Sequence, residues 1–482
     1  MTTKGVDYYF YIASLPGTSI TFSATDAGAS KPKFTDIMNS DSARWGTGNV
    51  QIGVAGVGIY GEVKWSLYTN PVIERRAKIN PLTGNLGGGS LADMMKTSSY
   101  TGGGLNVSYG FYDAGVGVGD LTNQDQVYCY FTGSMQNWMG DLVAQDASVN
   151  DAPFSSFVLP GAHDAGTFDL SAVKGLLAAG GAATTAFMSL LGPGAVLGAA
   201  VAGLTAAQAT TAITNLAVTQ KDDISTMLNL GCRYFDFRPG MLPKALQGFD
   251  GGIYHIHTAI PGYGYKAFLV DVLNWLQANP SEIVVVNANT AGFYDHASMD
   301  PSTDQLTKGL NDALNKTSST VLIGSASDLS SSYSTLIAAN KRLIFLNQIG
   351  EWYEASKYDS YNNSYKTTNP DNIIKAISAM NEQGQTGNDF TVLQLQGTAS
   401  GTGTAVVVAA ALSQSYASSP LMSTKAKFDY TTYPWVATNV PLNLGNGQLV
   451  VLLNDFVDNV LATTAQQLTL QRIQSLNSAT KG

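Results

Sequence analysis

The chain has 482 residues and a formal net charge of −9, and only 13% of its residues are charged, about half of the ~25% that is typical. The length exceeds that of one ordinary domain and fits two domains, or a barrel with an addition. The negative charge argues against a nucleic-acid partner, which requires a basic face, and against simple electrostatic docking on anionic lipid.

Residues 5 to about 135 contain short runs of β-branched and aromatic residues separated by turn residues, which predicts a sandwich of β-strands. The clearest runs are Tyr8–Ile12, Ser19–Ser23, Gly58–Tyr68, Leu105–Tyr112 and Gln126–Phe131. This region contains no histidine. We therefore expect residues 1–140 to form a β-rich accessory domain, with membrane, glycan or protein contact as its alternative roles.

A second feature is the apolar segment 171–218, because the chain carries no charge from Gly175 to Gln220. Its composition predicts two helices joined at Gly192-Pro193-Gly194, each about long enough for a membrane span. Alanine, glycine and threonine make both helices only weakly hydrophobic, and no basic cluster flanks them. The alternatives are a buried helical hairpin packed on the domain and a lipid-facing insertion.

From residue 219 onward, apolar runs typical of strands alternate with helical segments. Strands are predicted at 282–289, 342–347, 391–396 and 448–455, and helices at 268–278, 303–315 and 371–383. This alternation predicts a parallel sheet. About seven strands over this length favour a closed barrel, so we expect residues 150–482 to form one α/β barrel domain.

The candidate site combines three of these strands. His163 and Asp164 directly follow an apolar run, and His255 and His257 end a second one. Between them, Asp236 and Arg238 occupy alternate positions of a strand and should share one face. The chain has four histidines in total. Two histidines, carboxylates and an arginine suit transfer at a phosphate.

Four motifs, in this order, resemble the phosphatidylinositol-specific phospholipase C X-domain family. They are Leu159-Pro-Gly-Ala-His163-Asp164-Ala-Gly-Thr167, Gly231-Cys-Arg-Tyr-Phe-Asp236-Phe-Arg238, Tyr254-His255-Ile-His-Thr258, and Asn279-Pro-Ser-Glu282-Ile-Val-Val-Val. The segment Val450-Val-Leu-Leu-Asn-Asp455-Phe-Val-Asp458 is also similar to the family. The resemblance covers roughly residues 150–475 and implies a distorted TIM-type barrel.

The resemblance also implies roles for these side chains. His163 would be the general base, oriented by Asp455, with Asp458 as the competing partner. His255, supported by Asp164, would be the general acid, and His257 a neighbour without a catalytic role. Arg238 would stabilise the phosphate charge, and Asp236 would hold the site together by hydrogen bonds.

The same resemblance implies a metal-independent enzyme without cofactors, because Arg238 stands where calcium-dependent members have an acidic residue. Asn289 and Asn347 occupy the positions at which the bacterial type commonly has basic contacts to inositol. Asp359 and Tyr361 resemble the pair on which the sugar ring rests. Ile256 departs from the glycine that commonly follows the second histidine.

The implied function is cleavage of a phosphatidylinositol-type phosphodiester through a cyclic inositol phosphate, with a phospholipid membrane as partner. The alternative is a membrane- or glycan-binding, toxin-like protein on an inactive barrel. The N-terminus lacks the apolar core of a signal peptide. An extracellular or membrane-surface location is expected nevertheless, with a cytoplasmic one as the alternative.

Overall fold

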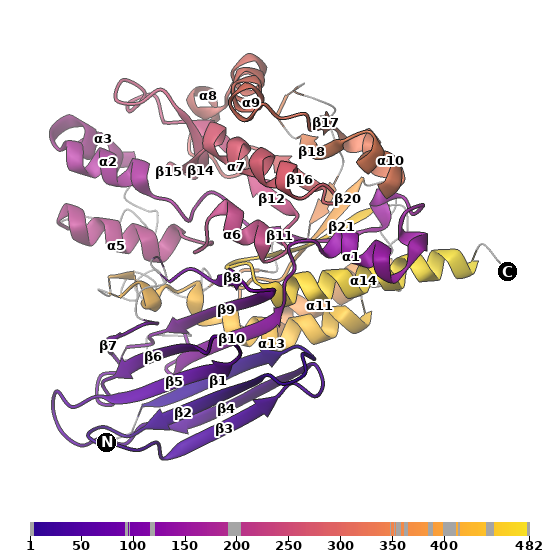
Figure 1. The fold of residues 1–482 in the computed structure, drawn as a ribbon. Helices are drawn as coiled ribbons and strands as arrows, with labels where there is room; N and C mark the ends of the chain where they lie inside the picture. The colour runs from indigo at the N-terminus through magenta and orange to yellow at the C-terminus, as the bar shows by residue number, and fades with distance from the viewer. Residues whose placement is uncertain are drawn as a thin grey trace.

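The structure is a computed structural model, and Figure 1 shows two bodies, a β-sandwich at the N-terminus and a larger α/β domain. The residues that the structure describes are 4–91, 95, 97–115, 121–190, 204–347, 349–350, 352, 358–360, 365–383, 389–398, 411–412, 415–439 and 448–479.

Two sheets form the N-terminal body, each of five strands within the described residues. One has the order β4 (Arg44–Gln51), β1 (Gly5–Ile12), β10 (Asp125–Gly133), β9 (Leu105–Tyr112) and β8 (Tyr100–Gly102). The other has the order β3 (Phe34–Asn39), β2 (Ser19–Thr25), β5 (Gly61–Tyr68), β6 (Ile73–Ile79) and β7 (Leu86–Gly89).

The sandwich forms because inward-facing residues of both sheets are large and apolar. On β2, for example, the alternate residues Ile20, Phe22 and Ala24 are buried, as a two-residue side-chain period requires. They share one core with Phe10 and Tyr109 of the other sheet. The five strands predicted from the sequence for residues 5 to about 135 all lie in these two sheets.

The α/β domain is built on a parallel sheet of eight strands within the described residues. Its order is β17 (Leu322–Gly324), β18 (Lys341–Asn347), β16 (Val284–Ala288), β12 (Tyr234–Phe237), β11 (Val158–Ala162), β21 (Leu449–Asn454), β20 (Phe390–Gln394) and β19 (Tyr358–Ser360). The parallel sheet was predicted, but the closed barrel is not found, since the described parts of β17 and β19 do not pair. Both edge strands have three residues and offer few backbone groups for a closing ladder.

Helices surround this sheet. They are α1 (Trp138–Gln145), α6 (Ile224–Asn229), α7 (Tyr265–Ala278), α8 (His296–Met299), α9 (Thr303–Thr317), α10 (Tyr333–Ala338), α11 (Pro370–Gln383), α13 (Met422–Asn439) and α14 (Asn459–Ala479). Local sequence sets their ends. Ser302 begins α9 in a reciprocal capping box with Gln305, and α7 ends before Asn279-Pro280.

The apolar segment 171–218 contains three described helices instead of the two expected long ones. These are α2 (Ser171–Ala179), α3 (Gly181–Leu190) and α5 (Ala206–Ala217), and the predicted turn at 192–194 lies outside the described residues. Buried Leu177, Phe187 and Ile213 join the main core of the domain. The segment therefore packs on the domain through one face, as the helical-hairpin alternative predicts.

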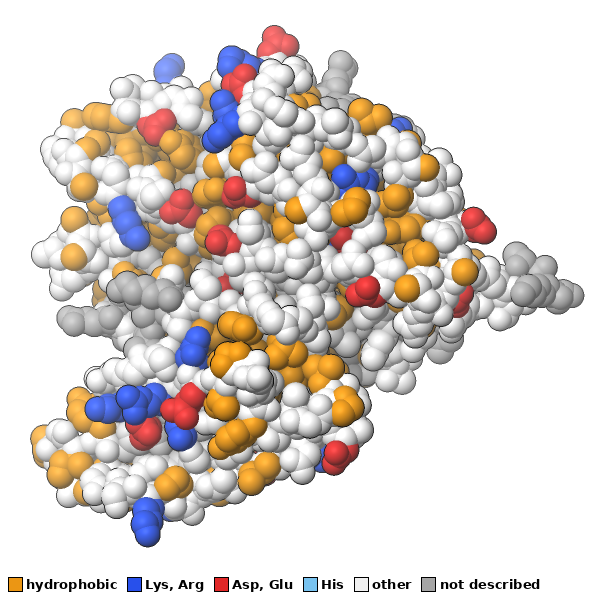
Figure 2. All heavy atoms as spheres, in the orientation of Figure 1, with side chains coloured by type: hydrophobic (Ala, Val, Ile, Leu, Met, Phe, Trp, Pro, Cys, Tyr) orange, Lys and Arg blue, Asp and Glu red, His pale blue; other side chains and the backbone are white. Residues whose placement is uncertain are grey.

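Across the described residues, none of the helices is both long enough and apolar enough to cross a membrane. Figure 2 shows that charged side chains are sparse on the visible face, where uncharged polar and apolar surface dominates. This agrees with the low charged fraction of the chain.

The two bodies meet along β10, β9 and β1 on one side and helices α13 and α14 on the other. Buried and partly buried aromatic side chains line the contact. Trp45 of β4 packs edge-on against Tyr130 of β10 and contacts Tyr433 of α13. The segment 136–156 links the two bodies and includes helix α1, whose buried Trp138 and Leu142 belong to a second core of the α/β domain.

Candidate active site

The first component of the site is the loop that follows β11. The backbone N–H of His163 donates to the carbonyl of Asn454, at the end of the neighbouring strand β21. Asp164 has φ of +44°, a conformation uncommon for a residue other than glycine, and its side chain is fully buried. Backbone strain of this kind concentrates at functional sites. The loop thus places both side chains at the carboxyl ends of adjacent parallel strands.

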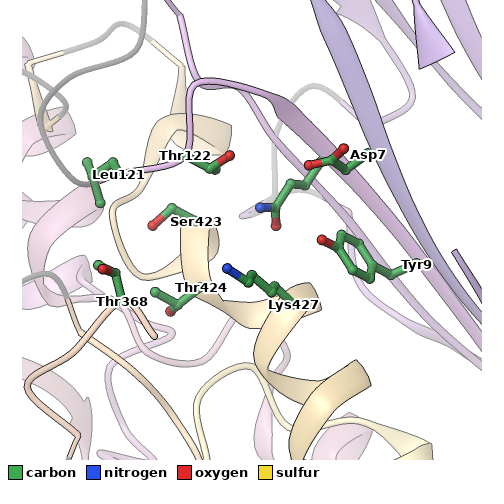
Figure 3. A pocket seen from close by; sticks show the side chains of 9 residues that line it. Asp7, Tyr9, Leu121, Thr122, Thr368, Ser423, Thr424 and Lys427 are labelled. Atoms are coloured by element: carbon green, nitrogen blue, oxygen red, sulfur yellow. The ribbon is translucent and has the colours of Figure 1, made fainter. Parts of the chain in front are cut away.

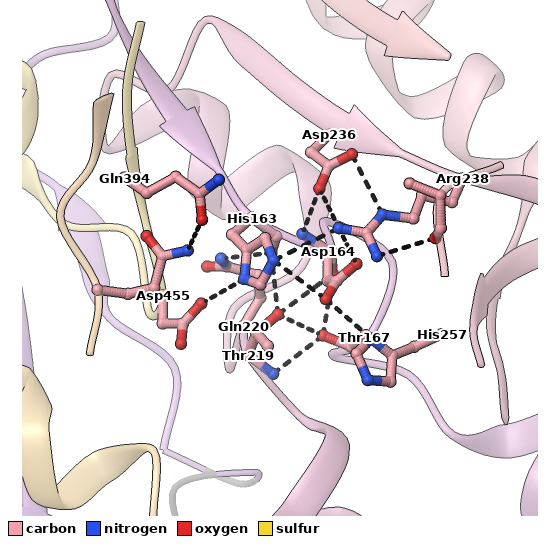
Figure 4. Close-up of polar contacts among 12 residues, drawn as sticks. His163, Asp164, Thr167, Thr219, Gln220, Asp236, Arg238, His257, Gln394 and Asp455 are labelled. Carbon is pink, nitrogen blue, oxygen red and sulfur yellow. Dashed lines mark hydrogen bonds and ion pairs between the residues drawn. The ribbon is translucent and has the colours of Figure 1, made fainter. Parts of the chain in front are cut away.

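His163 lies between two carboxylates. Its Nδ1 is 2.7 Å from Oδ1 of Asp455, which directly follows β21, and its Nε2 is 3.3 Å from Oδ2 of Asp164 (Figure 4). The contact with Asp455 is the one that the resemblance implies. Asp458 does not compete, because its carboxylate pairs with Lys425 and begins helix α14.

Asp236 and Arg238 come from the end of β12 and share one face, as predicted. Arg238 Nη2 is 2.8 Å from Oδ2 of Asp236, 3.1 Å from Oδ1 of Asp164 and 3.4 Å from Nε2 of His163. Its Nη1 donates to the carbonyl of Ala291. Asn289 donates to Asp236 at 2.7 Å, so this amide holds the carboxylate under the guanidinium.

The second histidine pair lies on a small antiparallel sheet of β13 (Pro239–Met241), β14 (Ile253–His257) and β15 (Ile260–Gly264). Both imidazoles face Asp164, as strand alternation predicts. His257 Nδ1 is 2.9 Å from Oδ2 of Asp164, whereas His255 Nε2 is 3.5 Å from Oδ1.

The two histidines differ in access and bonding. The His255 side chain is 0% exposed, and its Nδ1 accepts a hydrogen bond from the backbone N–H of Arg238. The His257 side chain is 32% exposed. Because a buried imidazole cannot meet a substrate, the geometry gives His257, and not His255, access to a reacting group.

The surroundings shift the pKa values of the site residues in different directions. Burial opposes charge on His163, but Asp164 and Asp455 outweigh it and raise the pKa of His163 to about 9. Burial lowers the pKa of His255. Burial would raise the pKa of Asp164, yet Arg238 and the neighbouring histidines hold that pKa well below its usual value. Asp164 is therefore an ionised carboxylate shared by one guanidinium and two accessible imidazoles.

Of the other predicted residues, only Asn347 has a described side chain, and no contact between it and this cluster is described. Asn347 ends β18 and uses its Oδ1 to accept the N–H of Ile349 in its own loop. Tyr361 lies outside the described residues, and for Asp359 the structure describes only the backbone, in β19.

Sequence reasoning missed the residues that hold the His163 loop from below. Gln220 donates through Nε2 to the carbonyls of His163 and Asn454, and Thr219 Oγ1 donates to the carbonyl of His163. Figure 4 shows both beneath the imidazole. Thr219 and Gln220 directly follow the apolar segment 171–218, and this abrupt return of polar residues was the available signal.

A cavity of about 260 Å³ lies apart from this cluster, between the two bodies (Figure 3). Its lining includes Asp7 and Tyr9 of β1 and Ser423, Thr424 and Lys427 of α13. None of the residues described above contributes to it, so the His163 cluster and this cavity are separate features.

Three residues of this cluster have the atoms that could hold a metal ion. Ligand atoms of His163, Asp164 and Asp236 lie within 4.8 Å of one another. Arg238 contacts both of these carboxylates, and its positive charge occupies the position that a cation would share. The donor set therefore fits a guanidinium better than a divalent ion.

No family model matches the chain, and no curated protein matches it. Among solved structures, a point mutant of phosphatidylinositol-specific phospholipase C from Staphylococcus aureus is similar at 16% identity and a TM-score of 0.40, over 69% of this chain and 96% of that one. The phosphatidylinositol-specific phospholipase C from Listeria monocytogenes is similar at 13% identity and a TM-score of 0.40, over 70% and 98%. This likeness is distant and does not place the chain in that family.

Proposed function

We propose that this protein is a phospholipase C-type phosphodiesterase in which His163 and His257 form the acid–base pair. One observation carries the proposal, namely that two accessible imidazoles and the Arg238 guanidinium contact the same buried carboxylate, Asp164. Phosphodiester cleavage needs a base and an acid on opposite sides of phosphorus and a fixed cation beside it.

In the proposed first step, the neutral form of His163, which is the minor form below its pKa of about 9, takes the proton of a hydroxyl neighbouring the phosphodiester. That oxygen bonds to phosphorus while the bond to the lipid alkoxide breaks. Protonated His257 gives its proton to the departing oxygen, and the products are diacylglycerol and a cyclic phosphate. Arg238 stabilises the charge on the phosphoryl oxygens, and Asp455 stabilises the imidazolium of His163.

His257 replaces His255 as the proposed acid for a second reason. The residue after His257 is Thr258, whose φ is +60°, a conformation that favours glycine. In the resembled family, a glycine commonly follows the second histidine. His257-Thr258 therefore accounts for that motif better than His255-Ile256 does. His255 would serve to fix the backbone of Arg238.

We propose an inositol phospholipid or a related glycolipid as the substrate class, because its 2-hydroxyl can form the cyclic product. This headgroup assignment rests on the sequence resemblance, which also assigns Asp359 and Tyr361 to the sugar ring. Asn289 is better explained as the support of Asp236 than as a headgroup contact.

The proposed lipid partner is supported by an apolar loop on the sandwich, between β4 and β5. Val54, Val57, Ile59 and Tyr60 are exposed there, and the Val57 side chain is 92% exposed. No charged residue interrupts this loop. Exposed apolar side chains at a loop tip are suited to a lipid surface, and they are consistent with an extracellular or membrane-surface location.

The deciding experiment is incubation with vesicles of single phospholipids, followed by phosphorus NMR. A cyclic phosphate from the inositol lipid, absent with the choline and ethanolamine lipids, is the expected result. The matched control is His296→Ala, which removes an exposed histidine that pairs with Asp300 and stacks on Phe293, outside the Asp164 cluster. Absence of product with every lipid would overturn the proposal.

The alternative function is lipid binding without turnover, and the exposed β4–β5 loop favours it as well. Vesicle flotation run beside the same assay separates the two functions. Flotation without release of any headgroup would support the alternative, whereas flotation with a cyclic product supports the enzyme.

A further inference from the structure

A buried polar cluster at the junction of the two bodies is not used in the proposed mechanism. Lys425 and Asp429 of α13 form an ion pair of 2.7 Å, and Lys425 also pairs with Asp458. The hydroxyl of Tyr433 donates to Asp458 at 2.8 Å. These side chains are almost completely buried. Buried charges are costly unless their partners are fixed, so this cluster should have one arrangement.

A side chain of the sandwich forms a hydrogen bond with this cluster. Tyr130 of β10 is fully buried and donates from its hydroxyl to Oδ2 of Asp429, at 3.0 Å. The other oxygen of Asp429 accepts from Nδ2 of Asn454, at 2.8 Å. Asp429 therefore joins a strand of the sandwich to the last residue of β21.

Asn454 transmits this contact to the site. Because Nδ2 donates to Asp429 and to the hydroxyl of Tyr433, the amide oxygen must point the other way, where it accepts the N–H of Asp455 at 2.9 Å. Asp455 then contacts Nδ1 of His163 at 2.7 Å. The carbonyl of Asn454 also accepts the N–H of His163.

We propose that the β-sandwich positions His163 through the chain Tyr130–Asp429–Asn454–Asp455, with Tyr130 as the positioning residue. The inference rests on the proposed function only in that His163 is taken as the catalytic base. The sandwich is then a structural part of the active site, not a separate accessory domain. Each link is a buried hydrogen bond, and Tyr130 itself touches no reacting atom.

A second contact between the bodies supports the same conclusion. Asp222 accepts from the N–H and the hydroxyl of Ser99, both at 2.7 Å, and Lys221 donates to the carbonyl of Thr97. These residues directly follow Gln220, which donates to the carbonyl of His163. Residues 97–99 of the N-terminal body therefore fix the other side of the His163 loop.

The test compares Tyr130→Phe with Tyr128→Phe. Both side chains are buried on β10, and their rings lie 5.0 Å apart. Among the described residues the Tyr128 hydroxyl has no hydrogen-bond partner, so its removal breaks no described link. Tyr433→Phe is the second variant, because it removes the other acceptor of Asn454 Nδ2 without altering the sandwich.

The readout is the Nδ1 proton of His163 by proton–nitrogen NMR, which needs no substrate. We expect this resonance to move upfield or to broaden by exchange in Tyr130→Phe and Tyr433→Phe, and to be unchanged in Tyr128→Phe. In the lipid assay, kcat should fall about 3- to 10-fold with KM unchanged, the factor of one ordinary hydrogen bond.

An unchanged His163 resonance in Tyr130→Phe, or an equal change in Tyr128→Phe, would overturn the inference. A protein without phosphodiesterase activity would contradict the proposed function alone, because the NMR comparison would still report on the chain from Tyr130 to His163. Thermal unfolding of each variant confirms that the spectra come from folded protein.

Discussion

The two sides of Asp164 are built differently. On one side, His163 follows a strand in the middle of the parallel sheet and is held by a second carboxylate, Asp455. On the other side, His257 belongs to a small antiparallel sheet outside the large one and has Asp164 as its carboxylate partner. The core sheet therefore fixes the imidazole of His163, whereas a peripheral hairpin carries the imidazole of His257.

The histidines on the two sides of Asp164 also differ in how strongly their surroundings favour the charged form. Two carboxylates stabilise an imidazolium at His163, whereas full burial disfavours it at His255 on the hairpin side. His257 keeps access to solvent, which the role proposed for it requires. The predictions below test whether the two sides have these separate tasks.

The largest expected effect is loss of turnover on removing either accessible imidazole. His163→Ala and His257→Ala should each lower kcat by a factor on the order of 10² to 10⁴, because each removes a proton-transfer group. His255→Gln should lower kcat far less, since a glutamine oxygen can still accept the N–H of Arg238. Steady-state kinetics check this order, and a loss in His255→Gln equal to that in His257→Ala would restore the original assignment.

The assignment of His257 illustrates what the sequence could and could not provide. Strand alternation correctly placed His255 and His257 on one face, and it placed Asp236 with Arg238. Burial was not readable from the motif, because the packing of Phe237 and Gly166 against the His255 ring involves residues far apart in the sequence. For the same reason, neither Tyr130 nor Asn454 could be predicted as a support of His163.

The fold, too, has features that the sequence predicted and features that it did not. Parallel strands and their helices were predicted because apolar runs and caps are local signals, as at Ser302 of α9. Closure of the sheet was not predictable, because it depends on the pairing of short edge strands with no local signature. The helices of 171–218 were expected, but their packing depends on complementary surfaces of the domain.

The next effect is on the free energy of unfolding. Its dependence on pH should have opposite signs for His163 and for His255. Since the pKa of His163 is raised from 6.5 to about 9, its contribution is complete below pH 6.5 and is lost as pH rises toward 9. The loss is up to about 3 kcal/mol. The pKa of His255 is lowered, so its contribution is lost as pH falls below 6.5.

Urea unfolding at several pH values measures both slopes. His163→Ala should abolish the loss above pH 6.5 and leave the acid side as in the wild type. His255→Gln should reduce the loss on the acid side only. If His163→Ala left the alkaline slope unchanged, the two carboxylates would not be holding a charged imidazole.

A smaller effect is expected from moving the hairpin that carries His255 and His257 away from the His163 loop. A Cβ on Gly166 would lie 2.3 Å from Cβ of His255, so Gly166→Ala must push the hairpin away from the His163 loop. The expected cost is about 1–3 kcal/mol of stability, with a lower kcat. Gly251→Ala is the matched control, because a Cβ there meets open space in the loop that precedes β14. Thermal unfolding and the lipid assay compare the two.

The smallest expected effect is that of a chelator, which should leave turnover unchanged. Arg238 already forms ion pairs with Asp164 and Asp236, so a divalent ion would have to displace a guanidinium that contacts both. Arg238→Gln sharpens the test, because it frees the donor set of His163, Asp164 and Asp236 while removing the fixed cation. We expect that variant to be inactive without metal and to regain some activity with calcium. Loss of wild-type activity on chelation, restored by calcium, would instead show that the guanidinium does not supply the positive charge between the two histidines.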